Sequence, residues 1–277
     1  MLKILTLNWN GEDKLKKLYP TLINSLSDIN YEWLVKDNNS TDNSVEYLKS
    51  INNGKITICP YKDNRQNFSA GVNYLFNIAS PADNDLIMLL NNDIIFNDTT
   101  SISNMMSIIK GDTSVGAVGA RLLYTGTNKL QHAGVVFDPT YRTPTHFRVN
   151  QVSDVHAEKN RQFQVVTGAV LITRASLFKN ANTNNLSGIN GMDERYHWAF
   201  DDVDLCLSIK YNMNKKIIYC GKTNIFHEES ATLKKNPANK MFLSHNLNYL
   251  FGKWGARYAI DKDIYIRTPH YNLYQEV

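Results

Sequence analysis

The chain is predicted to be an α/β protein with a mainly parallel central sheet flanked by helices, and three observations favour this class. Its 277 residues are 43% hydrophobic and 20% charged, a composition typical of a packed core. Up to about residue 120, short apolar runs alternate with stretches whose apolar residues recur at helical spacing. Clusters of polar side chains directly follow three of the apolar runs. Such a strand–helix alternation indicates parallel strands with helices on both faces of the sheet.

The first elements are predicted from local residue types. Residues 3–7 form a short apolar run typical of a strand, and residues 12–26 carry leucines at helical spacing. Residues 31–36 contain Tyr, Trp and Val, which favour a second strand. Residues 44–50 predict a short helix, and residues 56–59, with two isoleucines and a threonine, predict a third strand.

The alternation continues and then becomes less regular. Apolar spacing predicts helices over residues 70–79 and 99–110 and strands over residues 85–90 and 115–120. The second half predicts further strands, two helices and one loop rich in Asn, Ser, Thr and Gly: strands over 130–137, 164–173 and 216–219, helices over 202–211 and 240–254, and the loop over 180–191. No repeat or linker is evident, so a single domain with a variable C-terminal part is expected.

Composition and charge exclude several classes of function. The net charge of +4 is mild and no strong basic cluster exists, which disfavours nucleic-acid binding but leaves weak attraction to anionic lipid or phosphorylated ligands open. Cys59, Cys206 and Cys220 have no zinc-like spacing and are expected to be reduced, partly buried thiols. No run approaches the ~20 apolar residues of a membrane helix, and the N-terminus does not resemble a signal peptide. A soluble cytoplasmic protein is therefore expected.

Polar segments follow the first, second and fourth predicted strands. They are Asn8 to Gly11, Asp37 to Ser44 and Asn91 to Asp93. Ligands of such sheets bind beyond the carboxyl ends of the strands, so these segments are candidates for a ligand site. The chain has no Gly-x-Gly-x-x-Gly and no Gly-Lys-Ser/Thr loop, which disfavours a dinucleotide-binding unit and a P-loop. A nucleotide held by side-chain amides and a carboxylate fits better, with Asp37 accepting hydrogen bonds from a base or ribose.

Each of these segments also has a purely structural interpretation. Asn43 and Glu46 resemble a capping box at the start of a helix. Asp93 is a plausible Mg²⁺ or Mn²⁺ ligand, because these ions prefer oxygen donors, but a single Asp after a strand is also a common helix cap.

Three carboxylates crowd together near residue 200. Asp201, Asp202 and Asp204 follow Trp198 and Phe200 and begin a predicted helix. A carboxylate framed by aromatic rings could take a proton from a substrate hydroxyl. Alternatively, Asp201 or Asp202 simply caps the helix.

Taken in order, these motifs resemble family 2 of the inverting glycosyltransferases, which has the GT-A fold. Within it, the chain is similar to the rhamnosyl- and galactosyl-type branch of bacterial surface polysaccharide synthesis. The resemblance runs from about residue 2 to about residue 230. It rests on eight segments: Asn8-Trp9-Asn10-Gly11, Asp37 to Asp42, Phe68 to Asn73, Leu90 to Asp93, Gln131-His132-Ala133-Gly134, Val166-Thr167-Gly168-Ala169, Asp202-Val203-Asp204 and His227-Glu228-Glu229-Ser230.

The resemblance implies a GT-A type α/β fold with a Rossmann-like central sheet, a small acceptor-side sheet and a C-terminal helical part. It implies one glycosyltransferase domain over residues 1–230, with a nucleotide-sugar half over about 1–120 and an acceptor half over about 121–230. Residues 231–277 are then a helical extension of that domain.

For the donor, the resemblance implies a nucleotide diphosphate sugar, of UDP-hexose or dTDP-rhamnose type. The residues implied to bind it are Asn8, Asn10, Asp37, Asn39, Asn73 and Asn92. Asp93 and His227 are implied to hold Mn²⁺ or Mg²⁺, with diphosphate oxygens and water completing an open site. The metal would act as a Lewis acid on the departing diphosphate.

For catalysis, the resemblance implies direct displacement with inversion, and Asp202 as the base. Asp201 stays an alternative base, since two adjacent carboxylates can raise one pKa. Asp204 is expected to have a structural role, against the helix's own first turn or a neighbouring Lys or Arg. The residues implied on the acceptor side are Trp198, Phe200, Thr167 and Gly168, although the two aromatic rings could equally be core packing.

The implied acceptor is a saccharide, free or lipid-linked, and the implied location is cytoplasmic, in peripheral contact with the inner membrane face. Because no membrane helices of a processive synthase are present, transfer of a single sugar is expected. The chain departs from relatives at Asn67, where Gly is usual and a left-handed turn is expected, and around Arg65, where the usual pattern is offset. His132 and His146 lie in the segment that covers the acceptor side in relatives, and no role is assigned to them. The rival hypotheses are an inactive nucleotide-sugar-binding protein and a sugar nucleotidyltransferase, which would require a Gly-rich basic loop after the first strand.

Overall fold

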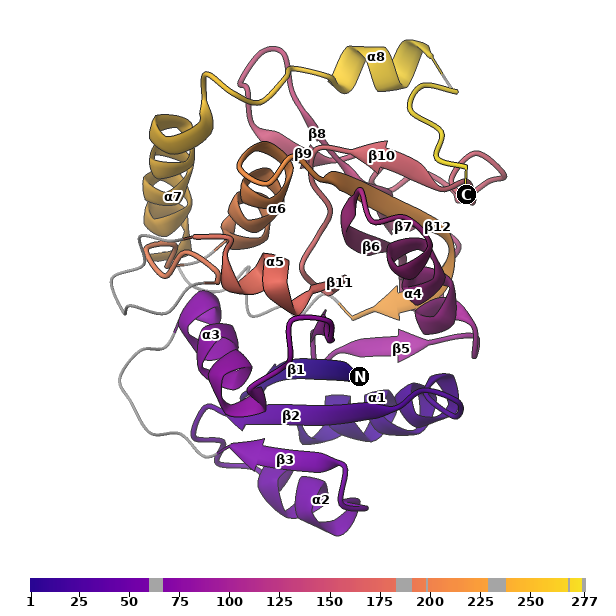
Figure 1. The fold of residues 1–277 in the computed structure, drawn as a ribbon, viewed down its shortest axis with the longest axis vertical. Helices are drawn as coiled ribbons and strands as arrows, with labels where there is room; N and C mark the ends of the chain where they lie inside the picture. Colours follow the sequence, from indigo (N-terminus) through magenta and orange to yellow (C-terminus); the bar gives the residue numbers. More distant parts are fainter. Residues whose placement is uncertain (60–66, 183–190, 198, 229–237, 269, 276–277) are drawn as a thin grey trace.

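The computed structural model describes residues 1–59, 67–182, 191–197, 199–228, 238–268 and 270–275, with no side-chain description for 238–241. Within these residues, a ten-stranded sheet has helices on both faces, and a two-stranded sheet accompanies it (Figure 1). None of the helices in the described ranges is long and apolar enough to cross a membrane.

The first half contains every element predicted for it, each within two or three residues of its predicted ends except the last strand, which runs four residues further. The elements are β1 (Leu2–Asn8), α1 (Glu12–Ser25), β2 (Tyr31–Asp37), α2 (Ser44–Ser50), β3 (Ile56–Cys59), α3 (Phe68–Ala79), β4 (Leu86–Leu90), β5 (Ile94–Phe96), α4 (Ser101–Gly111) and β6 (Val115–Tyr124). Only β5 was not predicted.

The second half departs more from prediction. Its elements are β7 (Leu130–His132), β8 (Val135–Phe137), β9 (Pro144–His146), β10 (Arg161–Phe163), β11 (Val170–Arg174), α5 (Ala175–Lys179), α6 (Asp201–Tyr211), β12 (Lys216–His227), α7 (Ala238–Trp254) and α8 (Lys262–Arg267). Most of the predicted loop over residues 180–191 lies outside the described residues.

The main sheet has the strand order β10-β12-β6-β11-β4-β1-β2-β3, with β5 paired to β12 and β7 paired to β6. Along this path β12, β6, β4, β1, β2 and β3 run in one direction, and β11 and β10 run against them. The mainly parallel sheet predicted from the sequence is therefore confirmed. Because β1, β2 and β4 are parallel neighbours, their carboxyl ends meet at one edge, where Asn8 lies opposite Asp37.

Three strands predicted for the second half were wrong in extent. The strand predicted over residues 216–219 continues to His227 as β12. The strand predicted over residues 130–137 is broken at Gly134, whose φ of +100° is disfavoured for any residue with a side chain. A Cβ there would also lie 2.4 Å from the ring of Phe163. The strand predicted over residues 164–173 begins only at Val170, because residues 164–169 leave the sheet to meet α6 and His132.

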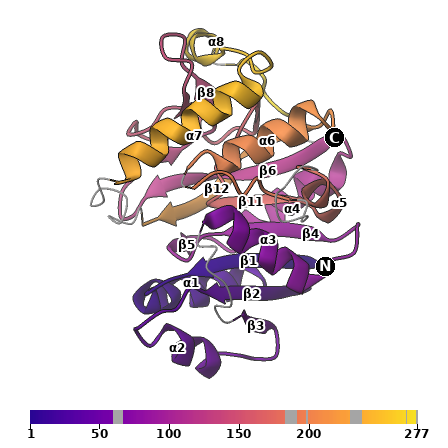
Figure 2. The same ribbon diagram turned by 90° about the vertical axis from the view of Figure 1, so that its left-hand side faces the viewer.

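The core lies on both faces of the sheet, and Figure 2 shows the helices layered on either side. Along β4, Ile87 and Leu89 pack toward the side of α3 and α6, whereas Leu86, Met88 and Leu90 pack toward the side of α1 and α4. Burial of each such side chain contributes roughly 1.5–3 kcal/mol to folding. This alternation holds the strand ends rigidly, which places the polar residues that follow them.

Several local expectations can be compared with the structure. The three cysteines form no disulfide bond and are more fully buried than predicted. Asn67 was expected in a left-handed turn, which was wrong: its φ is −81° and its side chain caps α3 by accepting from the N–H of Ala70. The capping box at Asn43 was also wrong, because Asp42 accepts the N–H of Ser44 instead.

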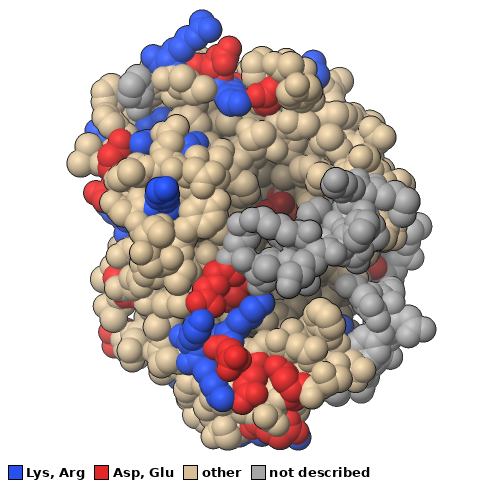
Figure 3. Space-filling model, turned by 180° about the vertical axis from the view of Figure 1, so that it is seen from behind, with Lys and Arg blue, Asp and Glu red and all other residues tan. Residues whose placement is uncertain are grey.

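The distribution of charged side chains over the surface is consistent with the net charge of +4. On the face shown in Figure 3, basic and acidic residues are interspersed rather than segregated. Ion pairs such as Lys16–Glu12 and Lys17–Glu228, both 2.7 Å, are of this mixed kind.

Candidate active site

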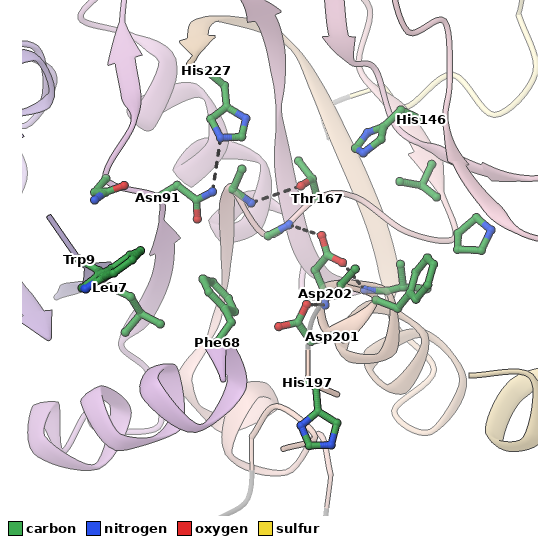
Figure 4. A pocket seen from close by; sticks show the side chains of 18 of the residues that line it. Leu7, Trp9, Phe68, Asn91, His146, Thr167, His197, Asp201, Asp202 and His227 are labelled. Atoms are coloured by element: carbon green, nitrogen blue, oxygen red, sulfur yellow. Dashed lines mark hydrogen bonds between the residues drawn. The ribbon is translucent and has the colours of Figure 1, made fainter. Parts of the chain in front are cut away.

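A cavity of about 590 Å³ lies at the edge where the strand ends meet. Its wall comes from the ends of β1, β4 and β12, from the segment before β11 and from the start of α6 (Figure 4). Eight of the residues predicted from the sequence to form a site line this cavity: Asn8, Asn92, Thr167, Gly168, Phe200, Asp201, Asp202 and His227.

Asn8 joins the three polar segments. Its Nδ2 donates to Oδ1 of Asp37 over 3.0 Å and to the hydroxyl of Ser40 over 3.3 Å. Its Oδ1 accepts from Nδ2 of Asn92 over 2.9 Å. Asp37 is buried and also accepts from the N–H and hydroxyl of Ser40. Three of the six predicted donor residues, Asn8, Asp37 and Asn92, thus form one hydrogen-bonded group, in which Asn8 and Asn92 line the cavity.

Asn10 and Asn39 shape the loops beside this group. Both have left-handed backbone, with φ of 45° and 64°, which Asn tolerates better than most residues. Oδ1 of Asn10 accepts the N–H of Thr41 over 2.7 Å, which ties the first loop to the second. Both are exposed and neither lines the cavity, so their donor contacts stay predictions.

Asn73 lies away from the cavity wall and is fully buried in α3. Its Nδ2 donates to the carbonyl of Met192 over 2.8 Å and to Oε1 of Glu194 over 2.9 Å, and its Oδ1 accepts the N–H of Met192 over 2.9 Å. These bonds attach residues 192–194 to α3. A contact of Asn73 with the donor stays a prediction.

Asp93 and His227 come together although 134 positions separate them in the chain. Nε2 of His227 lies 3.1 Å from Oδ1 of Asp93. Nδ1 of His227 lies 2.6 Å from Oε1 of Gln131, an acceptor, so the Nδ1 proton is donated there. In the neutral ring Nε2 then carries a lone pair, which faces the Asp93 carboxylate oxygen and also lies 3.4 Å from Nδ2 of Asn91. A cation between Nε2 and Oδ1 would offset the repulsion between these two acceptors. The donor set therefore fits a divalent metal, and Gln131 orients the histidine as outer residues commonly do.

The described residues contain no group of three or more His, Cys, Asp or Glu placed to hold a metal. If Asp93 and His227 hold a metal, two protein ligands would leave the open coordination that Mg²⁺ and Mn²⁺ use when they bind a diphosphate. Lys14, which sequence reasoning missed, lines the same part of the cavity with Nζ 3.8 Å from Oδ2 of Asp93. Its position in the first turn of α1 was predictable, but its direction was not.

Asp202 lies in the first turn of α6, on the cavity wall. Its Oδ2 accepts the N–H of Gly168 over 2.8 Å and its Oδ1 accepts the N–H of Val203 over 2.8 Å. A Cβ on residue 168 would lie 3.0 Å from Cβ of Asp202, so glycine permits this close approach. The helix cap is Phe200, and its side chain makes no cap hydrogen bond. Asp202 therefore accepts one hydrogen bond from an N–H in the first turn of its own helix and one from Gly168, in a separate segment.

Asp201 is in a different environment from its neighbour. It is buried, and its carboxylate accepts from the hydroxyl of Ser69 over 3.4 Å and from the N–H of Asp202 over 3.2 Å. Burial, and secondly the charge of Asp202, raise the pKa of Asp201 to about 7. Near neutral pH, Asp201 is therefore protonated in a large fraction of molecules.

The backbone that leads into α6 is strained. Ala199 and Phe200 both have left-handed φ, of 63° and 67°, a conformation that costs about 1–3 kcal/mol for residues other than glycine. Asn246 of α7 is buried and holds this turn, donating to the carbonyl of Ala199 over 3.2 Å. Thr167, Gly168 and Phe200 line the cavity, and their contact with an acceptor stays a prediction; Trp198 lies outside the described residues.

Asp204 was predicted to have a structural role, and its contacts agree with one. It is fully buried and accepts from Nζ of Lys253 over 2.9 Å, from Nε1 of Trp254 over 2.6 Å and from the hydroxyl of Tyr196 over 3.1 Å. Two of these donors come from α7, so α7 packs against the start of α6.

Solved structures show which architecture this is. The chain is similar to S. aureus TarS 1–349, with a TM-score of 0.55 and 12% identity over 92% of this chain and 73% of that one. It is similar to the mannosyltransferase PcManGT from Pyrobaculum calidifontis in complex with GDP-Man and Mn²⁺, with a TM-score of 0.60 and 12% identity over 97% and 69%. It is also similar to GalNAc-T7 with UDP, GalNAc and Mn²⁺, with a TM-score of 0.61 and 9% identity over 88% and 47%.

The fold is therefore that of the GT-A glycosyltransferases, as predicted, and the class of protein is a glycosyltransferase. The family model of Glycosyl transferase family 2 matches residues 4–178, more than half of the chain, so the chain belongs to that family. The matched range ends before α6 and therefore does not include Asp202 or His227. A comparison with curated proteins found no match.

Proposed function

We propose that this glycosyltransferase is metal-dependent and inverting, and that it moves one sugar from a nucleotide diphosphate sugar to a hydroxyl of a saccharide acceptor. The observation that carries the proposal is that Asp202, aligned by Gly168, and His227, paired with Asp93, lie at one cavity. A base and a site for a cation are the two devices that direct displacement of a diphosphate requires.

The donor would lie against the group formed by Asn8, Asn92 and Asp37, with Asn10, Asn39 and Asn73 in supporting positions. This assigns the donor to the half of the domain formed by residues 1–120. The donor types are UDP-hexose and dTDP-rhamnose, as in the rhamnosyl- and galactosyl-type branch. Support comes from the neighbours solved with UDP-GlcNAc and with UDP, although another neighbour carries GDP-Man.

Asp93 and His227 would hold Mn²⁺ or Mg²⁺. When bound, the ion would offset the negative charge that develops on the departing diphosphate. Lys14 faces the same region and would attract the diphosphate of the donor before and during transfer. Gln131 would keep the Nε2 lone pair of His227 directed at the ion.

Asp202 would act as the base. As the acceptor oxygen bonds to the anomeric carbon, its proton passes to the Asp202 carboxylate and the bond from that carbon to the diphosphate oxygen breaks. Attack opposite the leaving group inverts the anomeric configuration. Asp201 is the poorer base near neutral pH, because its raised pKa of about 7 leaves much of it protonated.

The acceptor would lie on the side of Thr167, Gly168 and Phe200, together with Trp198, in the half formed by residues 121–230. A saccharide, free or lipid-linked, suits this position in glycan or polysaccharide synthesis. The acceptor hydroxyl must come within hydrogen-bonding distance of Asp202.

The test is thermal-shift binding of UDP, dTDP, GDP, ADP and CMP, each with and without Mn²⁺, followed by product analysis with the sugar nucleotide of the best ligand. Binding raises the melting temperature by mass action. One diphosphate that requires Mn²⁺, and a glycoside product of inverted configuration, are expected. No shift with any nucleotide, or a product of retained configuration, would contradict the proposal.

A further inference from the structure

Two histidines meet on the Asp202 side of the cavity. His132 ends β7 and His146 ends β9, and their Nδ1 atoms lie 2.8 Å apart with the rings nearly perpendicular. His132 is fully buried, whereas His146 lines the cavity (Figure 4). A direct contact between two imidazoles requires that one donates and the other accepts.

The backbone determines which nitrogen of His132 carries the proton. Its Nε2 lies 3.3 Å from the N–H of Gly134 and 3.3 Å from the N–H of Thr167. Backbone N–H groups only donate, so Nε2 must be an acceptor. Burial, and secondly the neighbouring histidines His146 and His227, lower the pKa of His132 well below its ordinary value, so the ring is neutral. A neutral ring with a lone pair on Nε2 has its proton on Nδ1.

The tautomer of His146 follows from that of His132. Nδ1–H of His132 donates to Nδ1 of His146, so Nδ1 of His146 must carry a lone pair and no proton. The neutral His146 ring then carries its proton on Nε2. Placing a proton on Nδ1 of His146 would set two N–H groups against each other across 2.8 Å.

We propose that His146 contacts the acceptor through its Nε2–H, donating to a hydroxyl or ring oxygen of a neutral sugar, and that His132 is the positioning residue that imposes this tautomer. The proposal rests on the proposed function above. An uncharged donor suits a sugar oxygen, whereas a charged imidazolium would favour an acidic sugar.

The location favours the acceptor over the donor. The N–H of Thr167 bonds to His132, and the next N–H, that of Gly168, bonds to Asp202. The same short segment therefore holds both the base and the histidine pair. In Figure 4, His146, Thr167 and Asp202 lie on one side of the cavity, while Trp9 and Asn91 lie on the other.

The first arm of the test measures transfer to methyl glycosides of glucose, galactose, mannose, rhamnose and N-acetylglucosamine. His146→Ala is expected to raise the acceptor KM about tenfold, the effect of one lost hydrogen bond, and to leave Mn²⁺-dependent nucleotide binding unchanged. Deoxy analogues of the best glycoside then identify the partner oxygen. Removing that oxygen from the acceptor should raise the KM of the wild type about tenfold and leave the KM of His146→Ala unchanged. His156→Ala, at an exposed histidine that does not line this cavity, is the matched control.

The second arm identifies the tautomers by ¹⁵N NMR of enzyme labelled at its histidines. The histidine signals are assigned with the same variants. Near neutral pH, His132 is expected as the Nδ1–H tautomer and His146 as the Nε2–H tautomer. An Nδ1 proton or an imidazolium at His146 would overturn the proposal without requiring any transfer assay.

The outcomes separate this inference from the proposed function. An active enzyme whose acceptor KM is unchanged in His146→Ala overturns the contact and leaves the proposed function standing. An enzyme that binds a nucleotide but transfers to none of the glycosides overturns neutral sugars as the acceptor class. Absence of nucleotide binding in the wild type counts against the proposed function itself, and the proposal then falls with it.

Discussion

The N–H of Gly168 donates to Oδ2 of Asp202 over 2.8 Å, across 34 positions of sequence. This bond orients the carboxylate from outside its own helix. It also gives a reason why Gly168 lies outside the strand predicted for it, since the N–H of this residue bonds to Asp202 and not to a neighbouring strand. The geometry of Asp202 therefore depends on two segments at once.

Replacing Asp202 by Asn should remove the base while retaining an acceptor for the Gly168 N–H. The rate constant for transfer, kcat, is expected to fall by roughly 10²–10⁴, the usual contribution of general-base catalysis. Nucleotide binding with Mn²⁺ should change little, because the donor side of the cavity is untouched. Steady-state kinetics and thermal shift check both parts. Asp263→Asn, at a half-exposed carboxylate of α8, is the control, and full activity in Asp202→Asn would exclude Asp202 from the mechanism.

Removing either member of the Asp93–His227 pair should weaken binding of the metal with the nucleotide. His227→Ala is expected to abolish the Mn²⁺-dependent part of nucleotide binding, since one of two protein ligands is lost. Gln131→Leu should have a smaller effect, about 10–100-fold in metal affinity, because it only orients the histidine. Calorimetric titration of Mn²⁺ in the presence of the bound nucleotide measures both. Equal metal affinity in His227→Ala and wild type would rule out its role as a ligand.

Asp201 should make stability depend on pH. Its pKa of about 7 in the folded protein exceeds the ordinary value of 3.8, so between these values the folded state binds more protons than the unfolded state. The free energy of unfolding therefore falls as pH rises through this window. Asp201→Asn has no such titration, so its stability relative to wild type should be greater at about pH 8 than at about pH 5. Urea unfolding at both pH values measures the difference, and a constant difference would show that Asp201 does not titrate there.

Lys253, in α7, should stabilise the start of α6. Its Nζ lies 2.8 Å from Asp193 and 2.9 Å from Asp204, two carboxylates with no exposed surface. Lys253→Met leaves both buried charges without this partner and is expected to lower the free energy of unfolding by roughly 3 kcal/mol. Lys262→Met breaks the more exposed pair with Asp138 and should cost at most about 1 kcal/mol. Similar losses in the two variants, by denaturant unfolding, would contradict a special role for Lys253.

The elements of the first half were predictable because their causes are local. Residues 44–50 and 56–59 have the predicted bounds, since the spacing of apolar side chains and the preference of β-branched residues for strands act within a few positions. The break at Gly134 was not predictable, because it depends on the ring of Phe163, 29 positions away.

For the candidate site, the types of residue and their order along the chain could be seen in the sequence, and so could the edge of the sheet at which three polar segments meet. The partners of these side chains in the folded protein could not be seen in the sequence. Only the tertiary structure decided that Asp201 is buried and Asp202 less so on the wall of one cavity, that Asn73 bonds to residues 192–194, and that the Nδ1 atoms of His132 and His146 meet. Periodicity reports contacts along the chain, whereas burial, tautomers and ligand pairs arise from contacts between segments that only the folded chain brings within hydrogen-bonding distance.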